Sequence, residues 1–224
     1  MNLYRPLRPT LNYKDNSYAW NKDASPPSVV GQRFGENKAC IQDGRIFGTW
    51  DNVCPAPSIS LYTYYGMKGH NGLDIPCMIG DSIYAAHDGT IAKIEIDGNG
   101  GWGVRLLSDI IEPYKDGFCR FETLYWHIMP NPPVKKGQKV RVGDLIAFGG
   151  NTGAASTASH LHWGLKPRDA TTGKIALEAA NGYYGAIDPS PYIVEENAVN
   201  WQKIRILTAL VEAYKKLIAL YMSK

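Results

Sequence analysis

The six residues His160–Leu165, which read HLHWGL, decide the fold of this chain. Side chains in a β-strand alternate between the two faces of a sheet, so the three apolar residues of this stretch share one face, and His160 and His162 share the other. A strand with one apolar face is expected to pack on a hydrophobic core. Two neighbouring imidazoles on the opposite face indicate a metal site or a proton-transfer site.

The composition is that of an ordinary soluble globular protein. The chain has 224 residues, 44% of them hydrophobic and 20% charged, which is enough for one well-buried domain with appendages or two small domains at most. The net charge of +3 is too small to indicate a nucleic-acid partner, although it is compatible with an anionic polymer as substrate. No apolar run approaches the ~18 residues that are needed to span a membrane.

The sequence divides into three parts. Residues 1–28 contain four prolines without a sustained period and are expected to form an extended N-terminal arm. Residues 29–195 are the expected main domain, and residues 196–224 are expected to form an amphipathic helix. The chain begins with polar and proline-rich sequence that has no hydrophobic stretch, which predicts that it carries no secretory signal peptide.

The main domain is predicted to be mainly β, a compact antiparallel sheet. A strand is expected to begin at Val29–Phe34. Thr90–Ile96 and Trp102–Leu106 both alternate apolar with polar or small residues around a glycine-rich turn, which predicts a hairpin. Phe121–Ile128 is a further predicted strand, and residues 134–147 are expected to hold two short strands punctuated by glycine turns. Short strands at close spacing indicate antiparallel pairing.

The four cysteines of the chain form no C-x-x-C motif. Cys40 and Cys54 lie within residues 37–66, which are predicted to be a long loop region, and they flank a stretch that contains glycine. A disulfide between them and a pair of free thiols are both compatible with the sequence, so the cysteines do not define the compartment. Loops of this length in compact domains are often functional or form the wall of a pocket.

The amphipathic pattern near the C-terminus has one apolar face. Its apolar residues recur at steps of three and four, as in an α-helix: Ile204, Leu207, Val211, Tyr214, Ile218 and Tyr221. Lysines lie toward the C-terminal end, where the helix dipole favours cations. The apolar face has to be buried, and packing on its own domain, self-association and docking onto a larger assembly are all compatible with it.

The sequence GHNGLD places His70 and Asp74 four residues apart. An imidazole and a carboxylate are ligands that zinc accepts, and Gly72 between them allows the backbone to bend so that both converge. Such a pair is frequent by chance and is a weak signal alone.

His127 stands near the end of the predicted strand Phe121–Ile128. Strict alternation places it on the face of Tyr125, opposite Trp126. The fifth histidine, His87, precedes Asp-Gly and is interpreted as a surface or turn residue. Four of the five histidines therefore have a place in one site.

The order of these motifs resembles the lysostaphin-type zinc endopeptidases, which cut peptidoglycan cross-bridges. The shared pattern is H-x-x-x-D, then a strand ending in L-Y-x-H, then H-L-H, and the resemblance covers roughly residues 28–193. Further segments that resemble the family are 31–35, 72–75, 83–89, 140–146 and 150–153, together with Asp188-Pro189 followed by Tyr192.

The resemblance implies a role for each of five residues. His70, Asp74 and His162 would bind a zinc ion and leave one position open for water, which is the pattern of a catalytic zinc. His127 and His160 would flank that water and the scissile carbonyl, where one can accept a proton and one can stabilise the oxyanion. The sequence leaves the division of these roles between His127 and His160 open.

Two residues and one segment depart from the family pattern. Trp126 stands before His127 where a small residue is usual, Gly164 follows H-L-H where an acidic residue is common, and residues 109–120 form an enlarged loop. These positions are expected at the groove walls, so they concern substrate preference.

Aromatic residues are abundant near the predicted site. Trp163 and Trp126 are interpreted as core residues. Trp102 and Tyr125 are predicted to contact substrate, and Tyr62–Tyr65 is a further candidate for the groove.

The sequence therefore predicts a zinc metalloendopeptidase that hydrolyses stem or cross-bridge peptides of bacterial peptidoglycan. An alternative is a non-catalytic or structural wall-binding component of a larger assembly such as a phage particle. The absent signal peptide, the arm and the terminal helix motivate that alternative and suggest delivery as a virion-associated or otherwise non-classically exported lysin.

Overall fold

The computed structural model describes residues 1–7, 31–49, 52–194 and 214. Met1–Val194 forms one compact unit, and Glu195–Lys224 is a second unit in which Tyr214 alone is described. The predicted helix over residues 196–224 and the predicted arm beyond residue 7 therefore lie outside the described residues. Within the described part of the chain, no helix is long and apolar enough to cross a membrane.

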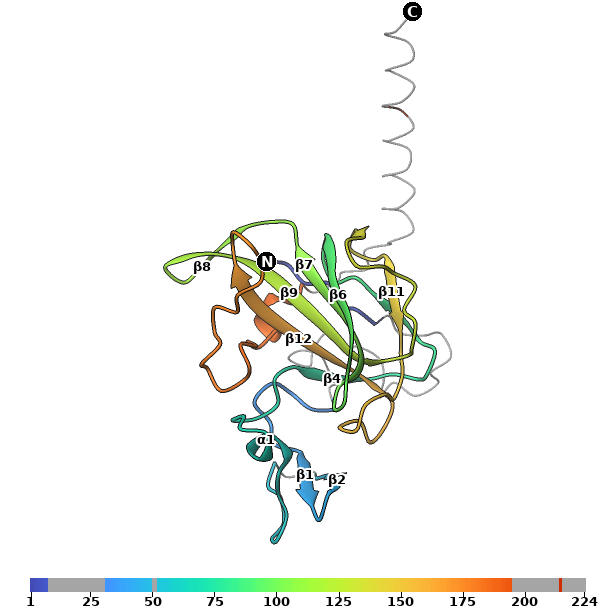
Figure 1. Ribbon diagram of the computed structural model, residues 1–224, viewed down its shortest axis with the longest axis vertical. Helices are drawn as coiled ribbons and strands as arrows, with labels where there is room; N and C mark the ends of the chain where they lie inside the picture. The colour runs from blue at the N-terminus through green and yellow to red at the C-terminus, as the bar shows by residue number, and fades with distance from the viewer. Residues whose placement is uncertain (8–30, 50–51, 195–213, 215–224) are drawn as a thin grey trace, which may run out of the picture. The chain divides into compact units, whose positions relative to one another are not determined.

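The centre of the first unit is a seven-stranded antiparallel sheet (Figure 1). Its strands run in the order β10 (Lys139–Val140), β6 (Gly89–Asp97), β7 (Gly101–Ser108), β9 (Gly117–Ile128), β12 (His160–Asp169) and β4 (Leu73–Pro76), and β8 (Glu112–Tyr114) pairs with β9. The predicted antiparallel β domain is thereby confirmed.

The strands β6 and β7 form the predicted hairpin. At the turn of this hairpin, Asp97 Oδ1 accepts hydrogen bonds from the backbone N–H groups of Asn99 and Gly100, each at 2.8 Å. This Asx-type turn ends the apolar alternation of β6 and starts that of β7. The two short strands expected within residues 134–147 are β10, which pairs with β6, and β11 (Leu145–Phe148), which pairs with β5 (Ser82–Tyr84).

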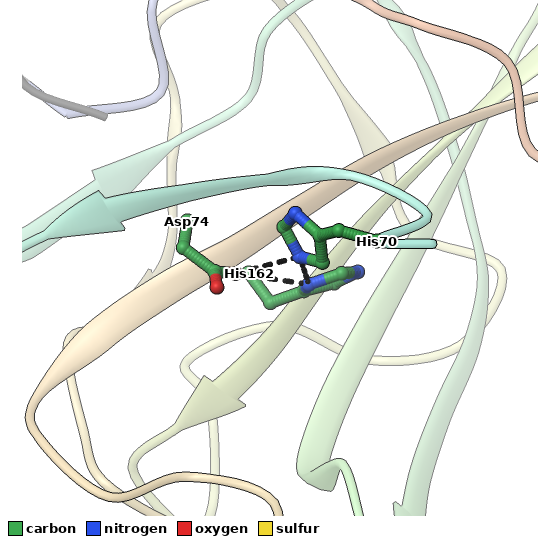
Figure 2. A group of neighbouring side chains, drawn as sticks. All are labelled: His70, Asp74 and His162. Atoms are coloured by element: carbon green, nitrogen blue, oxygen red, sulfur yellow. Dashed lines mark hydrogen bonds and ion pairs between the residues drawn. The ribbon is translucent and has the colours of Figure 1, made fainter. Parts of the chain in front are cut away.

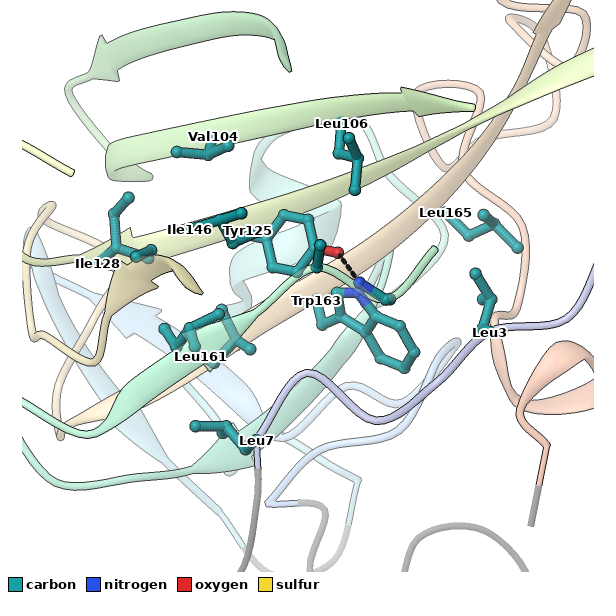
Figure 3. Packing of buried hydrophobic residues seen from close by; sticks show 14 of the residues in the cluster. Leu3, Leu7, Val104, Leu106, Tyr125, Ile128, Ile146, Leu161, Trp163 and Leu165 are labelled. Carbon is teal, nitrogen blue, oxygen red and sulfur yellow. Dashed lines mark hydrogen bonds between the residues drawn. The ribbon is translucent and has the colours of Figure 1, made fainter. Parts of the chain in front are cut away.

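The hydrophobic core lies against one face of the large sheet (Figure 3). Leu161, Trp163 and Leu165 of β12 are completely buried, as their alternation predicts. Leu3 and Leu7 from the start of the chain belong to the same core, and bridges join Leu3 to Ile193 and Leu7 to Ile83. The first seven residues thus pack across the domain.

Residues 37–66 form a small subdomain, here called the cap. It holds a three-stranded sheet of β2 (Arg45–Gly48), β1 (Ala39–Gln42) and β3 (Ile59–Ser60), followed by the short helix α1 (Leu61–Tyr64). The prediction of a long loop was wrong here, because these strands are too short to show a period. Of the two cysteine states left open, the structure has the Cys40–Cys54 disulfide, which joins β1 to the loop before β3.

The remaining predicted strand, Val29–Phe34, is not found in its described part. Gln32 instead makes a single bridge to Asp74 of β4, with Asp74 N–H donating to Gln32 O at 2.9 Å and Gly31 N–H donating to Asp74 O at 2.7 Å. These bonds occupy the free edge of β4 and hold the backbone of Asp74 in place.

Candidate metal centre and substrate groove

β12 presents His160 and His162 on the face opposite the core. Their side chains are 16% and 13% exposed, so both are partly shielded and still reachable from solvent. β12 lies between β9 and β4, and its register places His162 directly opposite Asp74. The antiparallel pairing therefore joins two motifs that are 88 residues apart in sequence.

Three ligand atoms converge next to β12 (Figure 2). His70 Nε2 lies 3.0 Å from Asp74 Oδ1, and His162 Nδ1 lies 3.1 Å from the same oxygen. The two ring nitrogens are 2.9 Å apart. Among the described residues, these three form a group of acidic and histidine side chains that could hold a metal ion.

The dimensions of this triangle suit a zinc ion. Bonds of ~2.0–2.1 Å to nitrogen and oxygen in a tetrahedral arrangement separate ligand atoms by about 3.3 Å, close to the observed 2.9–3.1 Å. Two unprotonated ring nitrogens that face each other at such a distance repel unless a proton or a cation lies between them. Two imidazoles and one carboxylate are also the ligand types that zinc prefers.

Backbone geometry orients the rings. His70 Nδ1 lies 3.1 Å from Arg33 O, and because a carbonyl oxygen can only accept, Nδ1 carries a proton and Nε2 is the nitrogen that faces Asp74. Gly72 lets the turn before β4 pass close to His162. A Cβ atom at this position would lie 2.8 Å from both His162 Nε2 and Trp163 O, so a larger residue cannot be accommodated without displacement.

His127 and His160 stand beside the triangle, with ring centroids 4.6 Å apart. His127 Nδ1 donates to Thr152 O at 2.8 Å, and His160 Nδ1 donates to Ala158 O at 2.7 Å. In the neutral form of each ring the unprotonated nitrogen is therefore Nε2. His160 Nε2 lies 3.5 Å from Asp74 Oδ1, beside the candidate metal site.

The electrostatics of the site favour neutral rings at His127 and His162 and an ionised carboxylate at Asp74. Burial lowers the pKa of His127 to about 3, and the neighbouring His160 and His162 add to this effect. Burial also lowers the pKa of His162. Burial of Asp74 raises its pKa, but the histidines around it outweigh this effect, so its pKa lies well below the usual value. Neutral rings and an ionised carboxylate are the protonation states that metal ligands require.

Comparison with known proteins identifies the region that carries this geometry. Residues 68–174 match the sequence profile of Peptidase family M23. All five residues described above lie within this matched region.

Individual proteins match this chain over about half of its length. An uncharacterized metalloprotease of Haemophilus influenzae is 33% identical over 97 residues, which is 43% of this chain and 18% of the relative's length. The catalytic domain of the antimicrobial peptidase lysostaphin from Staphylococcus simulans is 25% identical, with 56% of this chain and 79% of that chain covered and a TM-score of 0.42. The structure of LytU is 28% identical, with 55% and 72% covered and a TM-score of 0.43.

His127 reaches the site through a break in the alternation of β9. The prediction that His127 shares a face with Tyr125 was wrong. His127 has a positive φ of 63°, and the pairing with β7 jumps from Gly103–Trp126 to Trp102–Ile128, so His127 is an extra residue in a bulge. The bulge turns the His127 ring toward the same side as Trp126, while Ile128 returns to the core.

The structure also corrects three aromatic predictions. Tyr125 is completely buried, and its hydroxyl accepts the N–H of Ala86 at 3.0 Å, so it is a core residue and cannot contact substrate. Trp102 packs against the core and is not among the residues that line the groove. Trp126, predicted as core, lines the groove, whereas Trp163 is buried as predicted.

The groove in front of the histidines is a cavity of about 420 Å³. One wall comes from the cap, through Phe47 of β2 and Tyr62 and Tyr65 near α1. The other wall comes from the large sheet, through Trp126 and Lys166. The interpretation of Tyr62–Tyr65 as groove residues is thus confirmed for Tyr62 and Tyr65.

His87 is not a surface residue. It is 5% exposed, its Nε2 lies 2.9 Å from the Thr123 hydroxyl, and its Nδ1 lies 2.8 Å from Asp88 O. Burial lowers its pKa to about 4, which keeps the ring neutral. His87 is on the core side of β9 and is not part of the candidate metal group.

Sequence reasoning missed the charged part of the groove. Arg105 of β7 and Lys166 of β12 both line it. For Lys166 the signal was available, because it follows His162 at an even spacing on the same strand and therefore shares its face. Arg105 shows its position only once the register of β7 against β9 is known.

Proposed function

We propose that this chain is a zinc metalloendopeptidase that hydrolyses peptide bonds in the stem or cross-bridge peptides of bacterial peptidoglycan. The observation that carries the proposal is the triangle of His70 Nε2, Asp74 Oδ1 and His162 Nδ1, with sides of 2.9–3.1 Å, at the floor of a groove. A pocket with convergent polar groups and shifted pKa values is the usual setting of an active site.

His70, Asp74 and His162 would hold the metal as three protein ligands. A zinc ion at this position would polarise the scissile carbonyl and lower the pKa of water to about 7. The carbonyl of Arg33 fixes the His70 ring, and register pairing fixes Asp74 opposite His162. Ligands that are preorganised in this way lose little freedom when the ion binds.

His127 and His160 would carry the protons. Both offer an Nε2 lone pair beside the triangle because their Nδ1 protons are held by Thr152 O and Ala158 O. One ring can accept the proton of the attacking water and then deliver it, as an imidazolium, to the leaving amine. The same imidazolium charge stabilises the tetrahedral oxyanion.

The substrate class follows from the sequence resemblance to lysostaphin-type endopeptidases over residues 28–193 and from the shape of the groove. Aromatic side chains from the cap face the sheet across the cavity, so an extended peptide can lie between them.

The test is digestion of purified peptidoglycan by the zinc-loaded full chain, followed by mass analysis of the released muropeptides. We expect products that gain one water per cleaved peptide bond, loss of these products with a chelator, and less than about 1% of wild-type activity for His70→Ala or His162→Ala. Lys136→Ala, on an exposed position away from the groove, is the matched control and should remain active. A folded, zinc-loaded protein that leaves the walls of diverse bacteria uncut would contradict the proposal and favour a wall-binding or structural role.

A further inference from the structure

Lys166 extends the line of functional side chains along β12. It follows His160 and His162 at even spacings, so all three project from the same face of the strand, and all three line the groove. At a rise of ~3.3 Å per residue, the Cα atom of Lys166 is about 13 Å from that of His162. Lys166 thus marks a point well along the groove from the candidate metal centre.

The carboxylates near Lys166 are engaged by arginines. The register pairs Lys166 with Glu122 of β9, yet Glu122 Oε2 accepts Arg168 Nε at 2.8 Å and also binds the Nη2 group of the same guanidinium. Arg105 ion-pairs with Glu95 and lies 4.0 Å from Glu122. No ion pair of Lys166 is found among the described residues.

The excess charge is therefore positive at this end of the groove. Glu95 and Glu122 each form an ion pair with an arginine, and the ammonium of Lys166 forms an ion pair with neither carboxylate. Burial lowers the pKa of Lys166 to about 8, with further repulsion from Arg168 and Arg105, so the side chain is still mainly charged at neutral pH. A partly buried ammonium without a counter-ion favours an anionic ligand.

The floor of the groove between the metal centre and Lys166 is formed by Gly164. Gly164 is the residue between His162 and Lys166 on this face and has no side chain. A Cβ atom there would lie 3.3 Å from Leu124 Cδ1, so even a methyl group would crowd the wall of the groove. A peptide backbone can pass over Gly164 along β12 and reach both the metal centre and Lys166.

We propose that Lys166 binds a carboxylate of the substrate peptide, at a position about three to five residues from the scissile bond, and so makes the enzyme prefer acidic over amidated wall peptides. This inference rests on the proposed peptidase function. The spacing follows from the ~13 Å along β12 and the ~3.3–3.6 Å that each extended residue spans.

The test uses a wall peptide that the full zinc-loaded chain cleaves, synthesised in matched pairs with Glu or Gln at each position three to five residues from the cleaved bond on either side. For at least one position we expect kcat/KM to be about tenfold higher with Glu, mainly through a lower KM. Lys166→Met should abolish this preference, so that the Glu and Gln peptides are cleaved with equal kcat/KM. Lys166→Arg should restore it, because the charge returns.

Lys136→Met is the matched control, since Lys136 is exposed and outside the groove, and it should keep the wild-type preference. Equal cleavage of Glu and Gln peptides at every position, or an unchanged preference in Lys166→Met, would overturn the inference while the peptidase function stands. Absence of cleavage of any wall peptide by the wild-type chain would overturn the peptidase function and this inference with it.

Discussion

Asp74 Oδ1 is the atom on which the candidate site converges. His70 Nε2, His162 Nδ1 and His160 Nε2 lie 3.0, 3.1 and 3.5 Å from it. One carboxylate oxygen thus faces three ring nitrogens, an arrangement that a shared cation would satisfy. At the scale of single residues, the proposal assigns the ion to His70, Asp74 and His162, and proton transfer to His127 and His160.

Removing a proton-carrying ring should leave the metal in place. We expect His127→Ala and His160→Ala each to lower kcat by about 10²- to 10⁴-fold, because general acid–base catalysis contributes that much. Zinc content measured by elemental analysis should stay near one ion per chain, in contrast to His70→Ala. Loss of zinc from either variant would instead place that ring among the ligands.

Gly72→Ala tests whether the close approach of the turn to His162 matters. The added Cβ would meet the His162 ring and Trp163 O at 2.8 Å, so the ring has to shift away from Asp74. We expect zinc affinity, measured by competition with a chelator, to fall at least about tenfold, as when the support of a ligand is lost. Gly98→Ala is a suitable control because nothing lies within 4 Å of a Cβ there. Unchanged zinc affinity would show that the turn adapts freely.

At the scale of secondary-structure elements, period-two alternation predicted the faces of the side chains correctly on β12 and incorrectly at the end of β9. Every residue of β12 from His160 to Leu165 faces the side that period-two alternation assigns. On β9 the bulge at His127 reverses the assignment of Tyr125 and Trp126. The positive φ of His127 depends on tertiary contacts, which are the hydrogen bonds from its N–H to Gly100 O and from its ring to Thr152 O. The local sequence therefore does not predict it.

The metal-centre residues could be predicted because their chemistry is concentrated in short motifs with a recognisable order. Arg105 and the cap wall of the groove could not, because they depend on strand register and on strands too short to show a period. Phe47 acquires its position only when the cap and the sheet are both folded, whereas the even spacing of Lys166 from His162 already places it on the groove face.

The Cys40–Cys54 disulfide should support the groove wall. It closes a loop of about the length for which cross-linking contributes ~3 kcal/mol, and it anchors β1 next to groove residues of the cap. We expect the Cys40→Ser/Cys54→Ser double variant to have a higher KM for wall peptides and a lower melting temperature, with zinc content unchanged. Reductant should reproduce the effect in the wild type and have none in the variant. An unchanged KM would mean that the cap holds its shape without the bond.

At the scale of the whole molecule, the buried His87 should couple stability to pH. Its pKa of about 4 in the folded state lies below the ordinary value of 6.5, so the unfolded state binds more protons between these values. The stabilisation is fully present above pH 6.5 and is lost as the pH falls toward 4. The loss should amount to about 3 kcal/mol in the free energy of unfolding.

Denaturant unfolding of wild type and His87→Gln across pH 4–7 measures this coupling. The difference between the two proteins cancels the titration of the other histidines, so it should change with pH over this window and level off above it. A difference that stays constant with pH would show that His87 does not carry the coupling.

The most direct measurement is X-ray absorption spectroscopy at the zinc edge on the full chain loaded with one equivalent of zinc. The site built from His70, Asp74 and His162 predicts about one zinc per chain with nitrogen and oxygen neighbours only, at ~2.0–2.1 Å, two of them imidazoles. A sulfur neighbour at ~2.3 Å, or a spectrum that His162→Ala leaves unchanged, would contradict the proposed centre.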